Sequence, residues 1–237
     1  MEHILNHEKA HQKYFEEMTA IPHGSYHEQA YSAYLVAFAK EHGLKWIQDE
    51  LYNVIIYKDA SAGYEDHAPV LLQAHTDMVC EKNKDTDFDF EKDALKLYIE
   101  DGFLKARGTT LGADDGVGVA YMLALLSDPD AKHPPLECVF TVQEEVGLFG
   151  AMALKKEYFQ AKRMINLDDG GENATCTTSA GGVNVIMQKE RILVPHDGNG
   201  YQIDVFGLHG GHSGGEIDKE HGNANKLLAR VLFTLNR

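Results

Sequence analysis

Apolar residues recur along this chain with two different spacings, and both predict regular structure. Short, almost continuous apolar runs predict buried strands at 69–74, 137–142 and 164–167. Further short strands are expected at 44–49, 53–57, 183–192 and 201–207, with a hairpin near 97–104. Apolar residues at helical spacing predict one helix over the first ~20 residues and a second helix that ends at Gly43. They also predict helices at 117–126, near 149–158 and at 223–235.

This alternation of strands and helices predicts an α/β fold with a mixed, mostly parallel sheet flanked by helices. Ser25 precedes Glu28 by three residues, a spacing that is typical of a capping box and predicts the start of the second helix. From about residue 185 the pattern changes to strands between glycine-rich turns. We therefore expect one domain over 1–184 and the start of a smaller α+β domain over 185–237.

The charge balance restricts the partners of the protein. Among its 237 residues, 22 are Lys or Arg and 37 are Asp or Glu, so the formal net charge is −15. This balance argues against nucleic acid and anionic membranes as partners, because both bind basic surfaces. An acidic protein can bind cations, although an acidic surface also serves solubility alone.

The cysteines and the N-terminal residues indicate the compartment. Cys80, Cys138 and Cys176 are widely separated and form no Cys-x-x-Cys pair, which favours reduced structural thiols. The first ten residues lack the basic start and apolar run of a signal peptide, and no run reaches the ~18 apolar residues of a membrane span. We therefore expect a cytoplasmic protein.

Acidic and imidazole side chains follow the predicted strands and one loop. In chain order they are His75 and Asp77, Asp114 and Asp115, Glu144 and Glu145, and Asp168. A carboxylate beside a metal-binding histidine can hold the second ring nitrogen and orient the ring. Of two consecutive glutamates, one can bind metal and the other can act as a general base, provided the strand has ended and turned. Each motif alone also fits a structural histidine, a helix cap or a solvated strand end.

The combination is more specific than its parts. The predicted strands would deliver these groups to their carboxyl ends, where open α/β sheets bind ligands. A mixture of imidazole and carboxylate suits zinc, and Asp114 could bridge two ions. The sequence contains no Gly-x-Ser-x-Gly nucleophile motif, no phosphate-binding loop and no dinucleotide fingerprint after a strand. The pattern therefore predicts a metal-dependent hydrolytic site.

Four motifs carry a resemblance to a known family: His75-Thr76-Asp77-Met78, Leu111-Gly112-Ala113-Asp114-Asp115-Gly116, Glu144-Glu145-x-Gly147-x-x-Gly150 and Gly210-Gly211-His212-Ser213-Gly214-Gly215. In order and spacing they resemble the aminoacyl-histidine (Xaa-His) dipeptidases, which are carnosinase-like enzymes. These belong to the superfamily of co-catalytic zinc peptidases that also includes aminoacylases and peptidase T. The resemblance covers the whole chain, and it implies a zinc-peptidase catalytic domain followed by part of a lid and dimerisation domain.

The resemblance also implies a set of metal ligands. Two Zn²⁺ ions would be bound, with Co²⁺ or Mn²⁺ as substitutes. His75 and Asp168 would bind one ion, Glu145 would bind the other, and Asp114 would bridge them. The peptide bond after the bridging aspartate would be cis. The family often has Asn where Asp115 stands here, a mild departure.

Catalytic roles follow from the same resemblance. Glu144 would take a proton from the attacking water and later protonate the leaving amine, while Asp77 would orient His75. His212, in the lid domain of a homodimer, would reach the partner subunit's active site and stabilise the oxyanion. The glycine-rich motif around His212 would also fit a plain flexible turn.

The implied activity is hydrolysis of dipeptides, with His at the C-terminal position as the typical substrate. An aminoacylase or tripeptidase specificity within the superfamily is the alternative for the substrate. The family is about twice as long as this chain, and its last zinc-ligating histidine would lie beyond residue 237. A truncated, catalytically incompetent fragment that retains partial metal binding is therefore the alternative for the activity.

Overall fold

The computed structural model describes residues 3–171, 173–179, 181, 185–195, 197–211 and 215–235. Contacts between residues divide the chain into two compact units, Met1–Ser179 and Ala180–Arg237. The domain boundary expected after residue 184 lies a few residues beyond this division.

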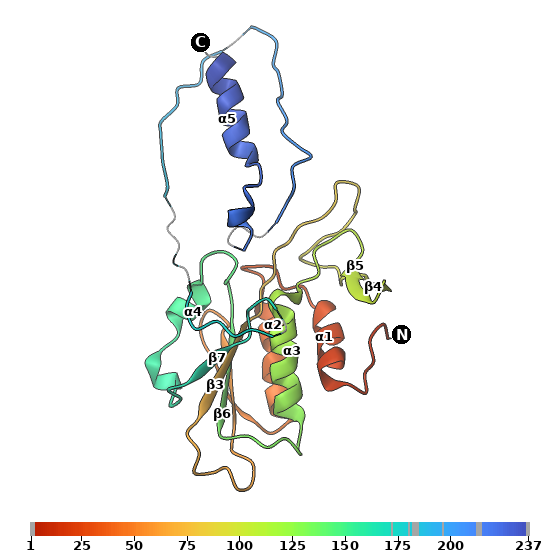
Figure 1. Cartoon of the computed structure of the whole chain (residues 1–237), viewed down its shortest axis with the longest axis vertical. Helices are drawn as coiled ribbons and strands as arrows, with labels where there is room; N and C mark the ends of the chain where they lie inside the picture. The colour runs from red at the N-terminus through yellow and green to blue at the C-terminus, as the bar shows by residue number, and fades with distance from the viewer. Residues whose placement is uncertain are drawn as a thin grey trace. The chain divides into compact units, whose positions relative to one another are not determined.

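A five-stranded sheet forms the centre of the first unit (Figure 1). Its strands are β1 (Lys45–Gln48), β2 (Val54–Lys58), β3 (Val70–His75), β6 (Leu136–Thr141) and β7 (Met164–Asn166), in the spatial order β1-β2-β6-β3-β7. β3 pairs in parallel with β6 and β7, whereas β2 pairs antiparallel with β1 and β6. Four of these five strands therefore run in the same direction, which confirms the predicted mixed, mostly parallel sheet.

Two helices, α2 (Gln29–Glu41) and α3 (Ala113–Ser127), pack against one face of this sheet, and α1 (Ala10–Thr19) packs against α3 (Figure 1). The core forms where their apolar residues, such as Phe15 and Leu123, meet alternate residues of the strands, such as Ile56 and Phe140. Alternation along a strand places every second side chain on this face. Burial of each large apolar side chain contributes about 1.5–3 kcal/mol, so this layer holds the first unit together.

The segment that follows β6 covers part of the opposite face. It contains α4 (Phe149–Ala153) and the short 3₁₀ helix η1 (Lys156–Tyr158), so the helix predicted near 149–158 is split in two. The split occurs because Leu154 takes an extended conformation, with ψ of 136°. Beyond it, the Tyr57 hydroxyl donates to the carbonyl of Tyr158 at 2.8 Å, and the carboxylate of Glu137 accepts the backbone N–H of Gln160 at 2.8 Å.

The remaining elements lie outside this sheet. β4 (Leu97–Glu100) and β5 (Phe103–Ala106) form the predicted hairpin, and the second unit holds η2 (Ile217–Lys219) and α5 (Ala224–Leu235), which confirms the predicted last helix. No helix in the described parts of the chain has both the length and the apolar character needed to cross a membrane.

Two strands predicted in the second unit are wrong. The described residues of 183–192 and the whole of 201–207 form no strand. Ile186 and Met187 are more than four-fifths exposed, at 82% and 90%. A strand requires a neighbour that accepts its backbone hydrogen bonds, and the structure pairs none with the described residues of these segments.

The predicted capping box at the start of α2 is also wrong. α2 begins after Glu28 without any hydrogen bond from a capping side chain. The Ser25 hydroxyl instead donates to the carboxylate of Asp77 at 2.7 Å, and the carboxylate of Glu28 accepts the backbone N–H of Gln143 at 3.0 Å. Both side chains are turned away from the helix because partners distant in sequence occupy their polar atoms.

Candidate metal centre

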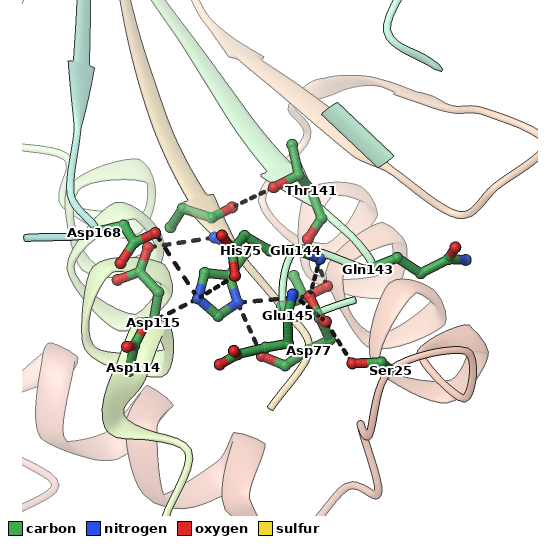
Figure 2. A network of polar contacts seen from close by, with 12 residues as sticks. Ser25, His75, Asp77, Asp114, Asp115, Thr141, Gln143, Glu144, Glu145 and Asp168 are labelled. Carbon is green, nitrogen blue, oxygen red and sulfur yellow. Dashed lines mark hydrogen bonds and ion pairs between the residues drawn. The ribbon is translucent and has the colours of Figure 1, made fainter. Parts of the chain in front are cut away.

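The carboxyl ends of three parallel strands meet at one edge of the sheet, as expected for an open α/β fold. His75 is the last residue of β3, Glu144 and Glu145 follow β6, and Asp168 follows β7. Asp114 reaches the same edge from the start of α3 (Figure 2). The structure therefore brings together residues that are up to about a hundred positions apart in the sequence.

His75 lies at the centre of this group with 1% of its side chain exposed. Its Nδ1 lies 2.9 Å from the backbone oxygen of Asp77 and 3.5 Å from the Asp77 carboxylate, two acceptors that keep the proton on Nδ1. Its Nε2 lies 2.9 Å from Oδ1 of Asp114 and 4.0 Å from carboxylate oxygens of both Glu144 and Asp168. The second nitrogen of the ring is therefore directed at three carboxylates.

Asp77 organises the loop after β6. Its carboxylate accepts the Ser25 hydroxyl at 2.7 Å and the backbone N–H groups of Glu144 and Glu145 at 2.9 and 3.2 Å. Burial raises the pKa of Asp77, but hydrogen bonds from His75, Ser25 and Glu144 outweigh it and hold the pKa below its usual value. Asp77 is thus an ionised, buried carboxylate that fixes the two glutamates and His75 at once.

The chain turns sharply between β6 and the two glutamates. Gln143 has a φ of 54°, in the left-handed region, and its N–H is held by Glu28. Consecutive residues of a strand point to opposite sides, so this turn is what allows Glu144 and Glu145 to approach the same centre. Burial, and then the surrounding carboxylates, raise the pKa of both glutamates, although His75 acts in the opposite direction.

Asp114 and Asp115 are joined by a cis peptide bond, as the resemblance implied. The Asp114 side chain is 64% exposed, whereas Asp115 is buried. The carboxylate of Asp115 accepts the backbone N–H of His75 at 3.3 Å and that of Gly118 at 3.2 Å. Asp115 therefore connects the first turn of α3 to the end of β3.

Negative charge is concentrated at this edge. Burial, and then the nearby Asp168, raise the pKa of Asp115 to about 7, although His75 opposes the shift. Burial also raises the pKa of Asp168, and Asp114 adds to the shift. For His75, burial lowers the pKa, but Asp77, Asp114 and Asp168 outweigh it and raise the value to about 10. Carboxylates this close repel one another, so the arrangement fits a bound cation.

The donor atoms also lie close enough to share an ion. One ligand atom each from His75, Asp114 and Glu145 lie within 4.8 Å of one another, and Asp168 is 4.0 Å from the same histidine nitrogen. Imidazole together with carboxylates is a ligand set that zinc accepts. The residues at this edge therefore fit a metal centre.

Six of the seven predicted site residues converge here: His75, Asp77, Asp114, Glu144, Glu145 and Asp168. The seventh, His212, lies outside the described residues. The distances place these side chains together without assigning each one its chemical role.

Three contributors were assigned no function at the site by the sequence-based prediction. Ser25 and Glu28 contact it only through Asp77 and Gln143, which lie far away in sequence. Asp115 was noted only as a departure from the family pattern. In the structure its buried carboxylate accepts a hydrogen bond from the backbone N–H of His75. Its position directly after Asp114 was the one local signal that pointed to a role at the site.

The chain matches a family model and one curated dipeptidase over most of its length. The model described as Peptidase family M20/M25/M40 matches residues 71–221. The cytosol non-specific dipeptidase of Escherichia coli strain K12 is 46% identical over 220 residues, which are 92% of this chain and 45% of the relative.

Solved structures agree with this match. The aminoacylhistidine dipeptidase of Vibrio alginolyticus superposes with a TM-score of 0.69 and 35% identity, over 94% of this chain and 46% of that chain. The aminopeptidase PepT of Bacillus cereus gives a TM-score of 0.58 and 26% identity, over 71% of this chain and 45% of that chain. The chain thus spans about half the length of these three proteins.

Proposed function

Since this chain belongs to the peptidase family M20/M25/M40, we propose that the centre around His75 serves the metal-dependent hydrolysis of dipeptides. The observation that carries the proposal is the single histidine nitrogen surrounded by carboxylates from two strand ends and α3. Peptidases of this family depend on metal ions, and the donor set described above fits them.

The proposed ligands follow the expected pattern. His75 and Asp168 bind one Zn²⁺, Glu145 binds a second, and Asp114 bridges the two. Support comes from the 2.9 Å separation of His75 and Asp114 and from the three-residue group that includes Glu145. When bound, such ions act as Lewis acids toward the peptide carbonyl and lower the pKa of water.

Glu144 is proposed as the general base. It receives the proton of the attacking water and returns it to the leaving amine. Its position supports this role, because its carboxylate lies 4.0 Å from Nε2 of His75 and its backbone is fixed by Asp77. Asp77 holds His75 in the orientation that directs Nε2 into the centre.

The parts that the described residues do not test are proposed on the resemblance alone. Residues 1–184 form the catalytic domain and 185–237 belong to a lid through which the protein forms a homodimer. His212 of the lid stabilises the oxyanion in the active site of the partner subunit. A cytoplasmic location is proposed as well, supported by the name of the Escherichia coli relative.

The decisive experiment measures hydrolysis of glycyl-histidine and β-alanyl-histidine by this chain with added Zn²⁺, together with its metal content. Turnover with at least two bound zinc ions per chain supports the proposal. Metal binding without turnover identifies the chain as a metal-binding segment that is not catalytic by itself.

The Xaa-His preference needs its own comparison. The two dipeptidases similar to this chain carry the names non-specific and aminoacylhistidine, so they support different breadths of substrate specificity. We propose that dipeptides with C-terminal His are preferred. Equal rates on glycyl-leucine contradict the preference, and faster cleavage of N-acetylated amino acids or tripeptides identifies an aminoacylase or tripeptidase specificity.

Asp114→Ala tests the bridging ligand. Because Asp114 is proposed to contact both ions, the variant should lose both, as measured by mass spectrometry of the native protein. Asp169→Ala, which removes a neighbouring exposed acid without a proposed ligand role, is the control and should retain the metal. An Asp114→Ala protein that still binds two zinc ions rules out the bridge.

A further inference from the structure

A second group of metal-ligating side chains lies at the N-terminus, made of His3, His7 and Glu16. The segment that carries the two histidines folds back on α1, where Glu16 lies. Backbone N–H groups of Ile4 and Leu5 each donate to one carboxylate oxygen of Glu16 at 2.9 Å. None of these residues contributes to the metal centre around His75.

The donor atoms of this group have the spacing of a metal site. Nε2 of His7 lies 3.0 Å from Oε2 of Glu16, and Nδ1 of His3 lies 3.9 Å from Oε1. One ligand atom from each residue lies within 4.8 Å of the other two. Ligands at ~2.0–2.1 Å from a tetrahedral zinc are about 3.4 Å apart, a value between the two measured distances. Rotation of the side chains therefore brings these donor atoms to one ion.

Glu16 is held in place before any ion binds. Its side chain is only 17% exposed, and two backbone donors fix its carboxylate. Burial raises the pKa of Glu16, but the N–H groups of Ile4 and Leu5 and the His7 ring outweigh it, so the pKa lies below its usual value. The carboxylate is thus ionised and positioned, as a metal ligand must be.

The two histidine rings are also brought together. The centroids of His3 and His7 are 3.6 Å apart, with 30° between the ring planes. The rings therefore lie against each other and rotate apart when their nitrogens bind one ion, because two imidazoles on one tetrahedral ion have centroids about 5 Å apart. His3 is 59% exposed, which leaves the fourth position of a tetrahedral ion open to water.

We propose that His3, His7 and Glu16 bind one Zn²⁺ at a site separate from the catalytic centre. The ion joins the N-terminal segment to α1, across the exposed Lys9. Leu5 lies between the two histidines and lines an apolar cavity of about 280 Å³ with residues of α1 and α3. The bound ion therefore holds one wall of this cavity against α1.

Zinc stoichiometry in an Asp114→Ala background tests the site, with the full chain purified without a histidine tag. This background lowers the zinc content of the catalytic centre. Adding His3→Ala and His7→Ala should remove one further zinc per chain. His27→Ala with His67→Ala, which removes two other exposed histidines, is the matched control and should not change the count.

Trypsin cleavage after Lys9 gives an independent measurement, because Lys9 lies between the histidines and Glu16. Zinc should slow this cleavage at least tenfold in the Asp114→Ala chain and in the control, and should have no effect once His3 and His7 are replaced. An unchanged zinc count on replacing both histidines overturns the proposal. Cleavage at Lys9 that zinc does not slow overturns it as well.

Discussion

At the scale of single residues, Asp77 is the side chain that positions most of the site. Its carboxylate is buried, and its partners come from three parts of the chain: the Ser25 hydroxyl, the His75 ring and the backbone of Glu144 and Glu145. A buried charge is stable only when such donors satisfy it. Removal of any one donor is therefore expected to disturb both the histidine and the two glutamates.

Ser25→Ala removes one donor of Asp77 without touching a proposed ligand. The loss of a hydrogen bond to a buried carboxylate costs about 1–3 kcal/mol in the free energy of unfolding. Residues that support metal ligands also affect metal binding, so we expect zinc affinity or turnover to fall roughly tenfold or more. Thermal unfolding and zinc titration measure the two effects.

Ser127→Ala is the control for this variant, because its hydroxyl donates only to the carbonyl of Ala124 within α3. It should leave zinc affinity unchanged. Equal zinc affinity and turnover in Ser25→Ala and Ser127→Ala would show that Ser25 has no positioning role.

Glu144→Gln distinguishes whether Glu144 acts as a general base or as a metal ligand. The amide cannot accept the proton of the attacking water, so turnover should fall by roughly 10²–10⁴-fold. The metal content should stay the same, because Glu144 is proposed to bind no ion. Mass spectrometry and single-substrate kinetics check the two parts. Loss of a zinc ion in Glu144→Gln would make Glu144 a ligand and reject its assignment as the base.

At the scale of elements, the first turn of α3 links the metal centre to the sheet. Asp114 and Asp115 depart from helical geometry, and the carboxylate of Asp115 binds both the N–H of Gly118 and the N–H of His75. The turn passes so close to Leu167 that Gly118 has no room for a side chain. The helix thus contacts the end of β3 and the residue after β7 where the candidate ligands meet.

Gly118→Ala tests this contact. The added Cβ would overlap the Asp115 carboxylate and come within 2.9 Å of Cβ of Leu167. Such overpacking costs about 1–3 kcal/mol in the free energy of unfolding, measured by denaturant titration. Gly170→Ala, where a Cβ meets nothing within 4 Å, should cost far less. Equal stability of the two variants contradicts the role of the close approach.

Elements with a strong local pattern could be predicted from the sequence. The apolar runs that became β3, β6 and β7 and the helical spacing of α1, α2 and α3 are set by burial, which leaves a periodic trace. The acidic residues of the candidate site directly follow those apolar runs, so the same pattern also marked the position of the site. Hydropathy therefore located the sheet and the candidate ligands together.

Contacts between distant residues left no such trace. The spacing of Ser25 and Glu28 has a local explanation as a capping box, yet both side chains bind residues more than fifty positions away. The apolar segments after residue 184 favour strands by composition, but strands form only beside a partner. In both cases the outcome depends on what lies next to the segment in space.

At the scale of the whole molecule, the charge at the sheet edge makes stability depend on pH. Folding raises the pKa of Asp115 from 3.8 to about 7 and that of His75 from 6.5 to about 10. Where the folded state holds its proton more tightly, stability falls as pH rises through the folded value. The pKa of Asp77 is lowered by folding, so the contribution of Asp77 to stability is lost only at acid pH.

The metal-free chain should therefore have a lower melting temperature at about pH 8.5 than at about pH 5.5. Zinc should raise the melting temperature more at the higher pH, because it relieves the repulsion between carboxylates and competes with fewer protons. Calorimetry with and without Zn²⁺ measures both. A melting temperature that rises with pH in the metal-free chain would contradict this account.

The strand order has a consequence for the synthesis of the chain. β3 lies between β6 and β7, and both follow it in sequence: Gln73 bonds to Thr141, 68 positions later, and to Asn166, 93 positions later. At translation rates of about 5–20 residues per second, β3 waits roughly 5–20 s before its second neighbour is made. Until β6 is made both edges of this apolar run are unpaired, and one edge stays unpaired until β7 is made. β3, which carries His75, is thus open during this interval to chaperones and to association between neighbouring chains on one messenger RNA.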